Sequence, residues 1–208
     1  MLFQGDDAMA KIMTASNPMT DGQIENAVDK LRASMRKHRS EIASDVAQRV
    51  LGVENLGMEM FSPFRKHAEA MSEMVVRHFK VNRAKTREAM VAALNRKQYV
   101  DADVLATMPT DGPEEGDLFF FPLERDTPAG GIAQVFASHD LVPDYVAQMQ
   151  VNADDPAFAD EHPNGMQWGG GPSYSCAFFD LWDVGREVYV YRSDDDWYGI
   201  YWFAGRLK

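Results

Sequence analysis

Hydrophobic side chains in the first part of the chain follow a helical spacing. Four of them recur at steps of four, three and four, namely Ile24, Val28, Leu31 and Met35. Such steps stack the side chains on one face of a helix. Thr20 or Asp21 suits the start of this helix, because a short polar side chain can accept a hydrogen bond from a free backbone amide. The pattern therefore predicts a long amphipathic helix from this cap.

Three further helices are expected before residue 95. Ser40 can cap a short helix that ends near Gly52, and Thr86 can open another short one. Between them, Pro63 suits the first turn of a helix, because that turn does not need the amide that proline lacks. The inner face of this helix would carry Phe64, Ala68, Met71, Val75 and Phe79. Residues 13–109 are thus predicted to form a helical region.

A different pattern follows this region. The polar run 110–116 is the best linker candidate in the chain. Residues 118–121, Leu-Phe-Phe-Phe, predict a strand that is buried on both faces, or the end of a strand that Pro122 interrupts. Two weak helices are expected at 131–138 and 143–151. Residues 152–171 are rich in proline and glycine and are expected to be irregular.

The end of the chain alternates, which predicts three short antiparallel strands around residues 175–179, 187–192 and 200–204. A period of two sends Val188 and Val190 to the core and Tyr189 and Tyr191 to solvent. The residues expected inside are Trp182, Val188, Val190, Trp197, Trp202 and Phe203, and Tyr198 is expected outside. The fold class is therefore α+β, with residues 117–208 as the second module.

Composition adds three limits. The 208 residues are 45% hydrophobic, which allows one domain or two small ones with a real core. The only cysteine, Cys176, cannot form an internal disulfide, and no apolar run is long enough to span a bilayer, so a cytoplasmic location is expected. The net charge of −11 is concentrated in the second half, so phosphate backbones could bind only through the first half.

The segment LFQG at residues 2–5 resembles a viral 3C-protease cleavage site. Residues 1–12 are therefore expected to be the remnant of a tag.

Candidate chemistry points to recognition rather than catalysis. Tyrosines and tryptophans interleaved with Asp, Ser and Gly are typical of binding surfaces, because aromatic rings give a large contact area for little lost entropy. Burial of most of these rings against the helical half is an equally good interpretation. Asp194–Asp196 lacks the ligand spacing of a calcium loop, His162 has no second histidine nearby in sequence, and Cys176 lies in no nucleophile motif. No metal, cofactor or catalytic residue is expected.

The last third of the chain resembles the variable proteins of bacterial diversity-generating retroelements. The resemblance lies in DPAFADEHPNG (Asp155 to Gly165) and DDDWYGIYWFAG (Asp194 to Gly205). In that family a reverse transcriptase copies a template with errors at adenines, so asparagine codons become codons for other residues. Residues that such changes produce stand here where the template would carry asparagine.

This resemblance implies a C-type-lectin-like fold, related to formylglycine-generating enzymes, with a variable region at about residues 176–205. It implies a macromolecular ligand, most simply a protein, and no enzymatic activity. Taken with the alternation, it gives as ligand-binding residues Asp180, Asp183, Val184, Glu187, Tyr189, Tyr191, Ser193, Asp195, Tyr198, Gly199, Ile200 and Tyr201. The helical region would serve packing or homo-oligomerisation.

Two other functions stay open at this point. One is an enzyme whose pocket is formed near residues 152–171, with an aspartate or His162 as the reactive group. The other is a nucleic-acid-associated protein that acts through its basic helices, where Arg77, Lys80, Arg83, Lys85 and Arg87 cluster. For that cluster, a solvated helix face or docking against the acidic half is the simpler interpretation.

Overall fold

The chain forms two compact units, one within residues 16–72 and the other over residues 73–208. We call them the helical unit and the sheet unit. The computed structural model describes residues 19–70, 74–170, 173–182 and 185–208. The predicted tag remnant therefore lies outside the described residues. Within those ranges, no helix combines the length and the apolar character that a membrane crossing needs.

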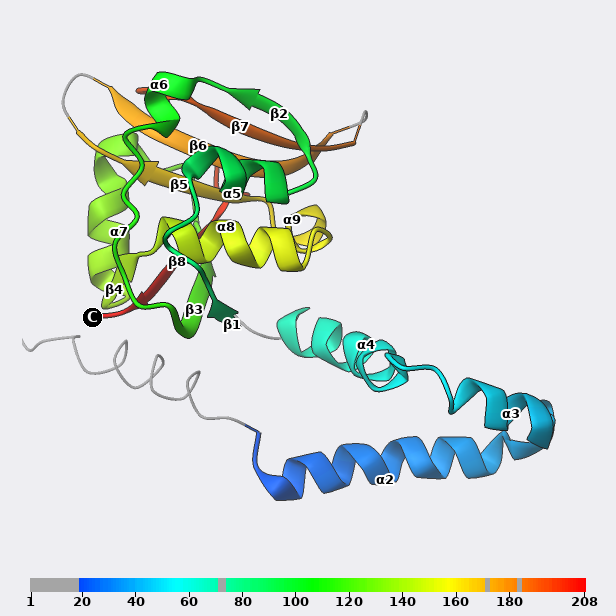
Figure 1. The fold of residues 1–208 in the computed structure, drawn as a ribbon. Coiled ribbons are helices and arrows are strands. Elements are labelled where there is room, and N and C mark those ends of the chain that lie inside the picture. Colours follow the sequence, from blue (N-terminus) through cyan, green and yellow to red (C-terminus); the bar gives the residue numbers. More distant parts are fainter. Residues whose placement is uncertain (1–18, 71–73, 171–172, 183–184) are drawn as a thin grey trace, which may run out of the picture. The chain divides into compact units, whose positions relative to one another are not determined.

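The helical unit consists of α2 (Asp21–Lys37), the 3-10 turn η1 (Arg39–Glu41), α3 (Ser44–Val50) and α4 (Leu56–Ala70) (Figure 1). α2 begins as predicted. The Thr20 hydroxyl accepts a hydrogen bond from the Gln23 amide at 3.3 Å, and the Gln23 side chain accepts one from the Thr20 amide at 2.9 Å. This reciprocal pair satisfies two amides that a helix start leaves free. Ser40, the predicted cap, lies inside η1, and α3 begins later than predicted, after Ala43.

The predicted helix through Pro63 is only partly right. Pro63 lies inside α4 rather than in its first turn, and α4 ends at Ala70. Val75 and Phe79 belong instead to strand β1 (Val75–Lys80), where both are buried. A separation of four residues puts two side chains on one face of a helix and also on one face of a strand. The spacing of this pair therefore could not distinguish the two elements.

The boundary between the units also differs from the prediction. The helical region was expected to reach residue 109, but strands β1 and β2 (Lys97–Val100) both lie within it. The chain divides near residue 72, and the polar run 110–116 lies inside the sheet unit. Met71, which was expected on the inner face of the Pro63 helix, lies outside the described residues.

A mixed sheet organises the sheet unit (Figure 1). Its eight strands run in the order β1-β3-β8-β5-β6-β7-β2, and β4 pairs with β8. The β2–β7 and β5–β8 pairs are parallel, and the other pairs are antiparallel. The remaining strands are β3 (Glu115–Pro122), β4 (Leu141–Pro143), β5 (Asn164–Trp168), β6 (Tyr174–Trp182), β7 (Gly185–Ser193) and β8 (Trp202–Leu207).

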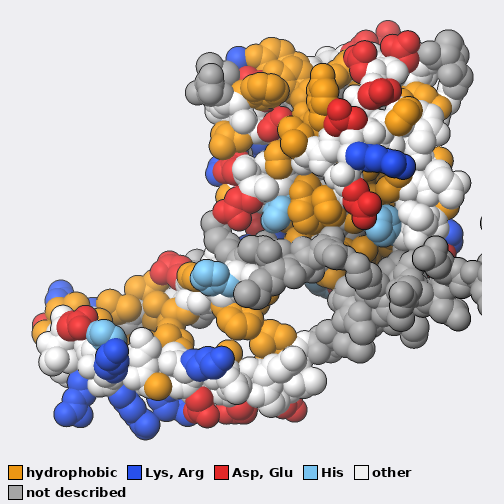
Figure 2. Space-filling model, turned by 180° about the vertical axis from the view of Figure 1, so that it is seen from behind, with side chains coloured by type: hydrophobic (Ala, Val, Ile, Leu, Met, Phe, Trp, Pro, Cys, Tyr) orange, Lys and Arg blue, Asp and Glu red, His pale blue; other side chains and the backbone are white. Residues whose placement is uncertain are grey.

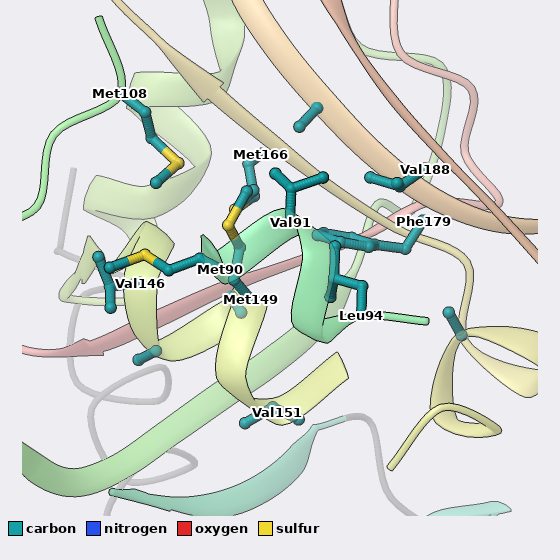
Figure 3. Close-up of a cluster of buried hydrophobic side chains, with 14 of the residues drawn as sticks. Met90, Val91, Leu94, Met108, Val146, Met149, Val151, Met166, Phe179 and Val188 are labelled. Atoms are coloured by element: carbon teal, nitrogen blue, oxygen red, sulfur yellow. The ribbon is translucent and has the colours of Figure 1, made fainter. Parts of the chain in front are cut away.

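Helices cover both faces of this sheet. They are α5 (Arg87–Ala93), α6 (Ala102–Leu105), the 3-10 turn η2 (Ala129–Gly131), α7 (Ile132–Ser138), α8 (Tyr145–Asp154) and α9 (Phe158–Glu161). On one face, Met90 and Met149 of α5 and α8 pack with Phe179 and Val188 of the strands (Figure 3). On the other face, α7 packs through Phe136.

Strand β3 confirms one prediction in full. Leu118 and Phe120 enter the core under α5 and α8, whereas Phe119 and Phe121 enter the core under α7. All four side chains are buried, which is why this strand is an unbroken apolar run. The fold is α+β, and the helices expected at 131–138 and 143–151 are present as α7 and α8.

Residues 152–171 were expected to be irregular, and that prediction is wrong, because they contain α9 and β5. A buried amide network orders them. Gln148 of α8 donates hydrogen bonds to the Asn164 side chain at 2.9 Å and to the Gly165 carbonyl at 3.0 Å. The Asn152 amide also donates to the Asn164 side chain, at 2.9 Å. These bonds tie β5 to α8, and the hydrophobic pattern shows no sign of them.

Candidate ligand-binding surface

Strand β7 separates a core face from an outer face. Val188 and Val190 are fully buried, as predicted, whereas Tyr191 is exposed and Tyr189 is half-buried. Side chains of a strand alternate between its two faces, so the tyrosines lie opposite the core that α5 and α8 cover. β7 pairs with β6 on one side and with β2 on the other. The outer face of these three strands is the candidate surface.

Three stacked rings cross this surface from strand to strand. We call Tyr99, Tyr189 and Phe178 the aromatic row. The Tyr189 ring stacks on Tyr99 with centroids 4.7 Å apart and on Phe178 with centroids 4.6 Å apart. Each contact joins cross-strand neighbours, since Tyr189 is paired with Tyr99 in β2 and with Phe178 in β6. Such pairs stabilise a sheet and fix the orientation of their rings.

The outer end of the row carries charge as well as aromatic surface. Tyr99 is 41% exposed on β2, the last strand of the sheet. The Lys97 ammonium lies 4.9 Å from the centroid of the Tyr99 ring and 3.5 Å from a Glu187 carboxylate oxygen. A cation over a ring face is attracted to it. This edge therefore offers an aromatic ring with a cation above it.

Glu187 holds the rings in place rather than facing solvent. Its side chain is on the outer face but is only 2% exposed as a residue. It accepts a short hydrogen bond from the Tyr189 hydroxyl, and the Tyr99 hydroxyl lies 3.5 Å away. The bond to Glu187 is the main cause that raises the pKa of Tyr189 to about 12, and burial adds to it. Both hydroxyls are therefore directed toward one carboxylate.

Asp180 has a similar role on the neighbouring strand. It is the cross-strand partner of Glu187 and is 8% exposed. It accepts hydrogen bonds from the Tyr201 hydroxyl at 3.2 Å and from the Leu181 amide at 2.7 Å. Burial, followed by the charge of Asp180, raises the pKa of Tyr201. The Tyr201 ring meets Phe178 edge-on, with centroids 5.8 Å apart, and closes the buried end of the aromatic row.

The segment between β7 and β8 forms the rest of the surface. Trp197 anchors it, because its indole donates to the Gln167 side chain at 2.7 Å and its backbone pairs with Thr127. Beyond this anchor, Tyr198 and Ile200 are 65% and 64% exposed. A hydrogen bond of 3.1 Å from the Tyr201 amide to the Tyr198 carbonyl turns the segment toward the aromatic row.

Gly199, between these two exposed residues, is held close to the body. Its amide donates to the Asp126 carboxylate at 2.8 Å. A Cβ atom added there would lie 3.1 Å from backbone atoms of Arg125, which is tighter than ordinary contact. At the start of the segment, the Ser193 hydroxyl donates to the Asp195 carboxylate at 2.9 Å, and the Asp195 amide donates back to Ser193 at 3.0 Å.

The predicted ligand-binding residues that the structure describes thus fall into three groups. The exposed ones are Asp195, Tyr198, Ile200 and Tyr191, whose ring also meets Phe178 edge-on with centroids 5.8 Å apart, and those in intermediate positions are Tyr189, Ser193 and Gly199. Asp180, Glu187 and Tyr201 are buried and support the others. Asp183 and Val184 lie outside the described residues.

Several side-chain placements were missed or wrong. Tyr99 and Lys97 were not predicted, since only the pairing of β2 with β7 brings residues so distant in sequence to the same surface. Phe178 was also missed, although it lies in the predicted strand at residues 175–179. Trp182 was expected inside but is 55% exposed at the end of β6, where the strand extends past the core. Trp202 is half-buried and meets His162 edge-on at 4.6 Å between ring centroids.

Other candidate groups lie away from this surface or are engaged. Burial raises the pKa of the Cys176 thiol to about 12, and the thiol donates to the Tyr191 carbonyl at 3.3 Å. Of the basic cluster, Arg83 pairs with buried Asp144 at 2.7 Å, and Arg87 donates to the Met108 carbonyl at 2.8 Å. Among the residues described, no three His, Cys, Asp or Glu side chains gather as metal ligands.

Comparison of the chain with protein-family models, with curated proteins and with solved structures finds no match. The site must therefore be interpreted from its own geometry.

Proposed function

We propose that the sheet unit is a ligand-binding module that recognises a protein through the aromatic row and the segment of residues 193–201. The observation that carries this proposal is the split on β7, where valines are fully buried on one face and tyrosines reach the other. Aromatic rings that are already stacked lose little entropy when a partner covers them. The exposed groups extend over three strands and a loop, as a contact with a macromolecule requires.

The proposal includes the origin of the surface. The chain is a variable protein of a diversity-generating retroelement, with a C-type-lectin-like module and a cytoplasmic location. The burial pattern supports it, because the proposed variable positions include largely exposed side chains, such as those of Tyr198 and Ile200. A surface that must change between copies of a gene needs such positions over an invariant core. Asp180, Glu187, Gly199 and Tyr201 would tolerate fewer substitutions, since each is packed or hydrogen-bonded.

Sequencing of the 3′ end of the gene across a population of the source organism tests the origin. The expected result is substitution at Tyr191, Asp195, Tyr198 and Ile200, confined to codon positions that carry adenine in the template. A near-copy of this region beside a reverse-transcriptase gene is expected as well. Substitutions spread evenly along the gene would contradict the proposal.

Binding itself is tested with two libraries displayed on the full chain. One randomises Tyr191, Asp195, Tyr198 and Ile200. The matched control randomises four exposed residues at the β1–β3 end of the same sheet, namely His78, Lys80, Glu115 and Asp117. Selection against a panel of unrelated proteins is expected to yield binders at least about tenfold more often from the first library. Equal yields would mean that the outer face of β7 has no special aptitude for recognition.

A further inference from the structure

The apolar side chains that the structure describes in the helical unit do not form a buried core. None of the side chains described between Met19 and Ala68 is buried. The predicted stripe of α2 stays open, with Ile24 45% and Leu31 42% exposed. Other exposed apolar residues of this unit include Val46, Val50, Leu51, Met58, Phe61 and Phe64. The unit has two arms, one formed by α2 and the other by α3 and α4. Figure 2 shows hydrophobic side chains gathered between them.

Such a unit needs a partner in order to stay folded. An isolated helix of the length of α2, Asp21–Lys37, is only marginally stable in water, and most helical stability comes from packing an apolar face. An exposed apolar stripe of this extent marks an interaction surface. The charged residues beside the stripe indicate which partner would cover it.

Charged residues on one flank of α2 change sign along the helix. Asp21 and Glu25 occupy this flank in the first half, and Arg32, which also pairs with Asp29 of its own chain, and Arg36 occupy it in the second. Their separations of four, seven and four residues keep all of them on the same side of a helix with 3.6 residues per turn. One flank of the apolar stripe is therefore acidic at its start and basic at its end.

This arrangement is self-complementary. When two identical helices pack antiparallel through the same stripe, the twofold axis sets each flank against the same flank of the partner, with its direction reversed. The acidic half then faces the basic half of the other copy. A parallel pair would bring different flanks together at equal height and would lose this match. Antiparallel packing also aligns the two helix dipoles favourably.

We propose that the stripe of α2 is covered by α2 of a second copy of this chain, packed antiparallel. The register that matches apolar groups places Ile24 opposite Met35 of the second copy and Val28 opposite Leu31. Glu25 then lies near the level of Arg36 of the second copy, once on each side of the axis. The arm formed by α3 (Ser44–Val50) and α4 (Leu56–Ala70) packs its apolar residues around this pair, which completes a bundle of helices from two chains.

The first experiment measures the mass of the full chain in solution by sedimentation equilibrium over a range of protein concentrations. A dimer is expected. Leu31→Asp places two carboxylates at the centre of the interface and should weaken dimerisation at least about 100-fold. The matched control, Ala33→Asp, introduces the same group on the opposite, exposed side of α2 and should leave the dimer intact. All four tryptophans lie in the sheet unit, so their unchanged fluorescence shows that the variants remain folded there.

Charge reversal tests the direction of packing. Glu25→Arg alone sets one arginine against Arg36 on each side of the axis, and Arg36→Glu alone sets one glutamate against Glu25 on each side. Each single change should weaken dimerisation about tenfold at low salt. The double variant exchanges the two charges within one chain and should restore the affinity. Restoration is expected only when these two positions face one another across two chains.

Disulfide trapping gives an independent check of the register. Mixed Ile24→Cys and Met35→Cys variants should form a cross-linked dimer, because only cysteines with close Cα atoms can be bridged. A monomer at all concentrations, a dimer that survives Leu31→Asp, failure of the double charge variant to restore affinity, or self-cross-linking of Ile24→Cys in place of the mixed product would each overturn the proposal.

Discussion

In the sheet unit the apolar residues of the helices are buried, with Met90 of α5 6% and Met149 of α8 1% exposed, whereas on α2 of the helical unit Ile24 and Leu31 are 45% and 42% exposed. The sequence patterns of the two regions are of the same kind. A step of three or four residues specifies a helix with an apolar face, but it does not specify what that face meets. In the sheet unit the same chain provides the partner, and in the helical unit we assign that role to a second copy.

The difference predicts that truncations to alanine have unequal effects in the two regions. Phe120 is fully buried, and its ring centroid lies 4.6 Å from that of Phe158. Phe120→Ala should cost about 3–5 kcal/mol in the free energy of unfolding of the sheet unit, because a large cavity is left in a packed core. Leu31→Ala should change that free energy by less than about 0.5 kcal/mol.

Chemical denaturation followed by tryptophan fluorescence measures this prediction, since every tryptophan belongs to the sheet unit. An equal loss of stability from both substitutions would mean that the two units do not fold independently.

The N-terminal caps of α8 and α2 allow a second, smaller comparison between the two units. Asp144 caps α8, accepting a bond from the Ala147 amide at 3.1 Å and another from Arg83 at 2.7 Å, with its side chain fully buried. Asp144→Ala should cost about 3 kcal/mol, because Arg83 loses its buried counter-charge. Thr20 caps exposed α2, and Thr20→Ala should cost the helix about 1 kcal/mol.

Circular dichroism reports the loss at α2, and tryptophan-monitored unfolding reports the loss at α8. Asp144→Asn serves as the control, since asparagine keeps the cap but removes the charge, and it should lie between wild type and alanine. If Asp144→Ala proved as mild as Thr20→Ala, the buried ion pair would contribute nothing beyond an ordinary cap.

Most elements of the fold could be predicted from local patterns, and the failures have two causes. The α7 and α8 helices, strand β3 and the β6–β7 pair each carry a periodic or unbroken apolar signal. Val75 and Phe79 were misassigned because their spacing fits two periods. Strand β5 was missed because the buried amides of Gln148, Asn152 and Asn164 order it, and such a polar network leaves no mark in a hydrophobic pattern.

The residues of the candidate surface were likewise predicted only in part. Alternation placed Val188 and Val190 correctly and identified the face that Tyr189 and Tyr191 occupy. Alternation could not show that Glu187, on the same face, would be buried. The tyrosines that cover it direct their hydroxyls toward its carboxylate. Nor could alternation find Tyr99, which reaches the surface only through a parallel pairing with a strand some ninety residues away in the chain. The two-residue period of a strand shows on which face of the sheet a side chain lies. Its exposure depends on which distant strands pair beside it.

Alkaline pH should also separate the two regions. Every tyrosine and the only cysteine lie in the sheet unit. Burial raises the pKa of Tyr145 from 10.0 to about 12 and that of Cys176 from 9.0 to about 12. Between about pH 9 and 12 the unfolded chain therefore loses protons that the folded chain keeps, so the stability of the sheet unit falls as pH rises. Each group contributes at most about 1.4 kcal/mol per pH unit within its own window.

Denaturation of wild type and Tyr145→Phe at several pH values from 8 to 12 measures this slope. The substitution removes one titrating group, so the fall in stability between about pH 10 and 12 should become shallower, although the lost hydrogen bond to the Gln167 carbonyl lowers stability at every pH. The native thiol should also resist alkylation at pH 8 and react once the sheet unit unfolds, because the buried group keeps its proton. A slope identical in both proteins would show that the Tyr145 hydroxyl ionises as freely in the folded state as in the unfolded one.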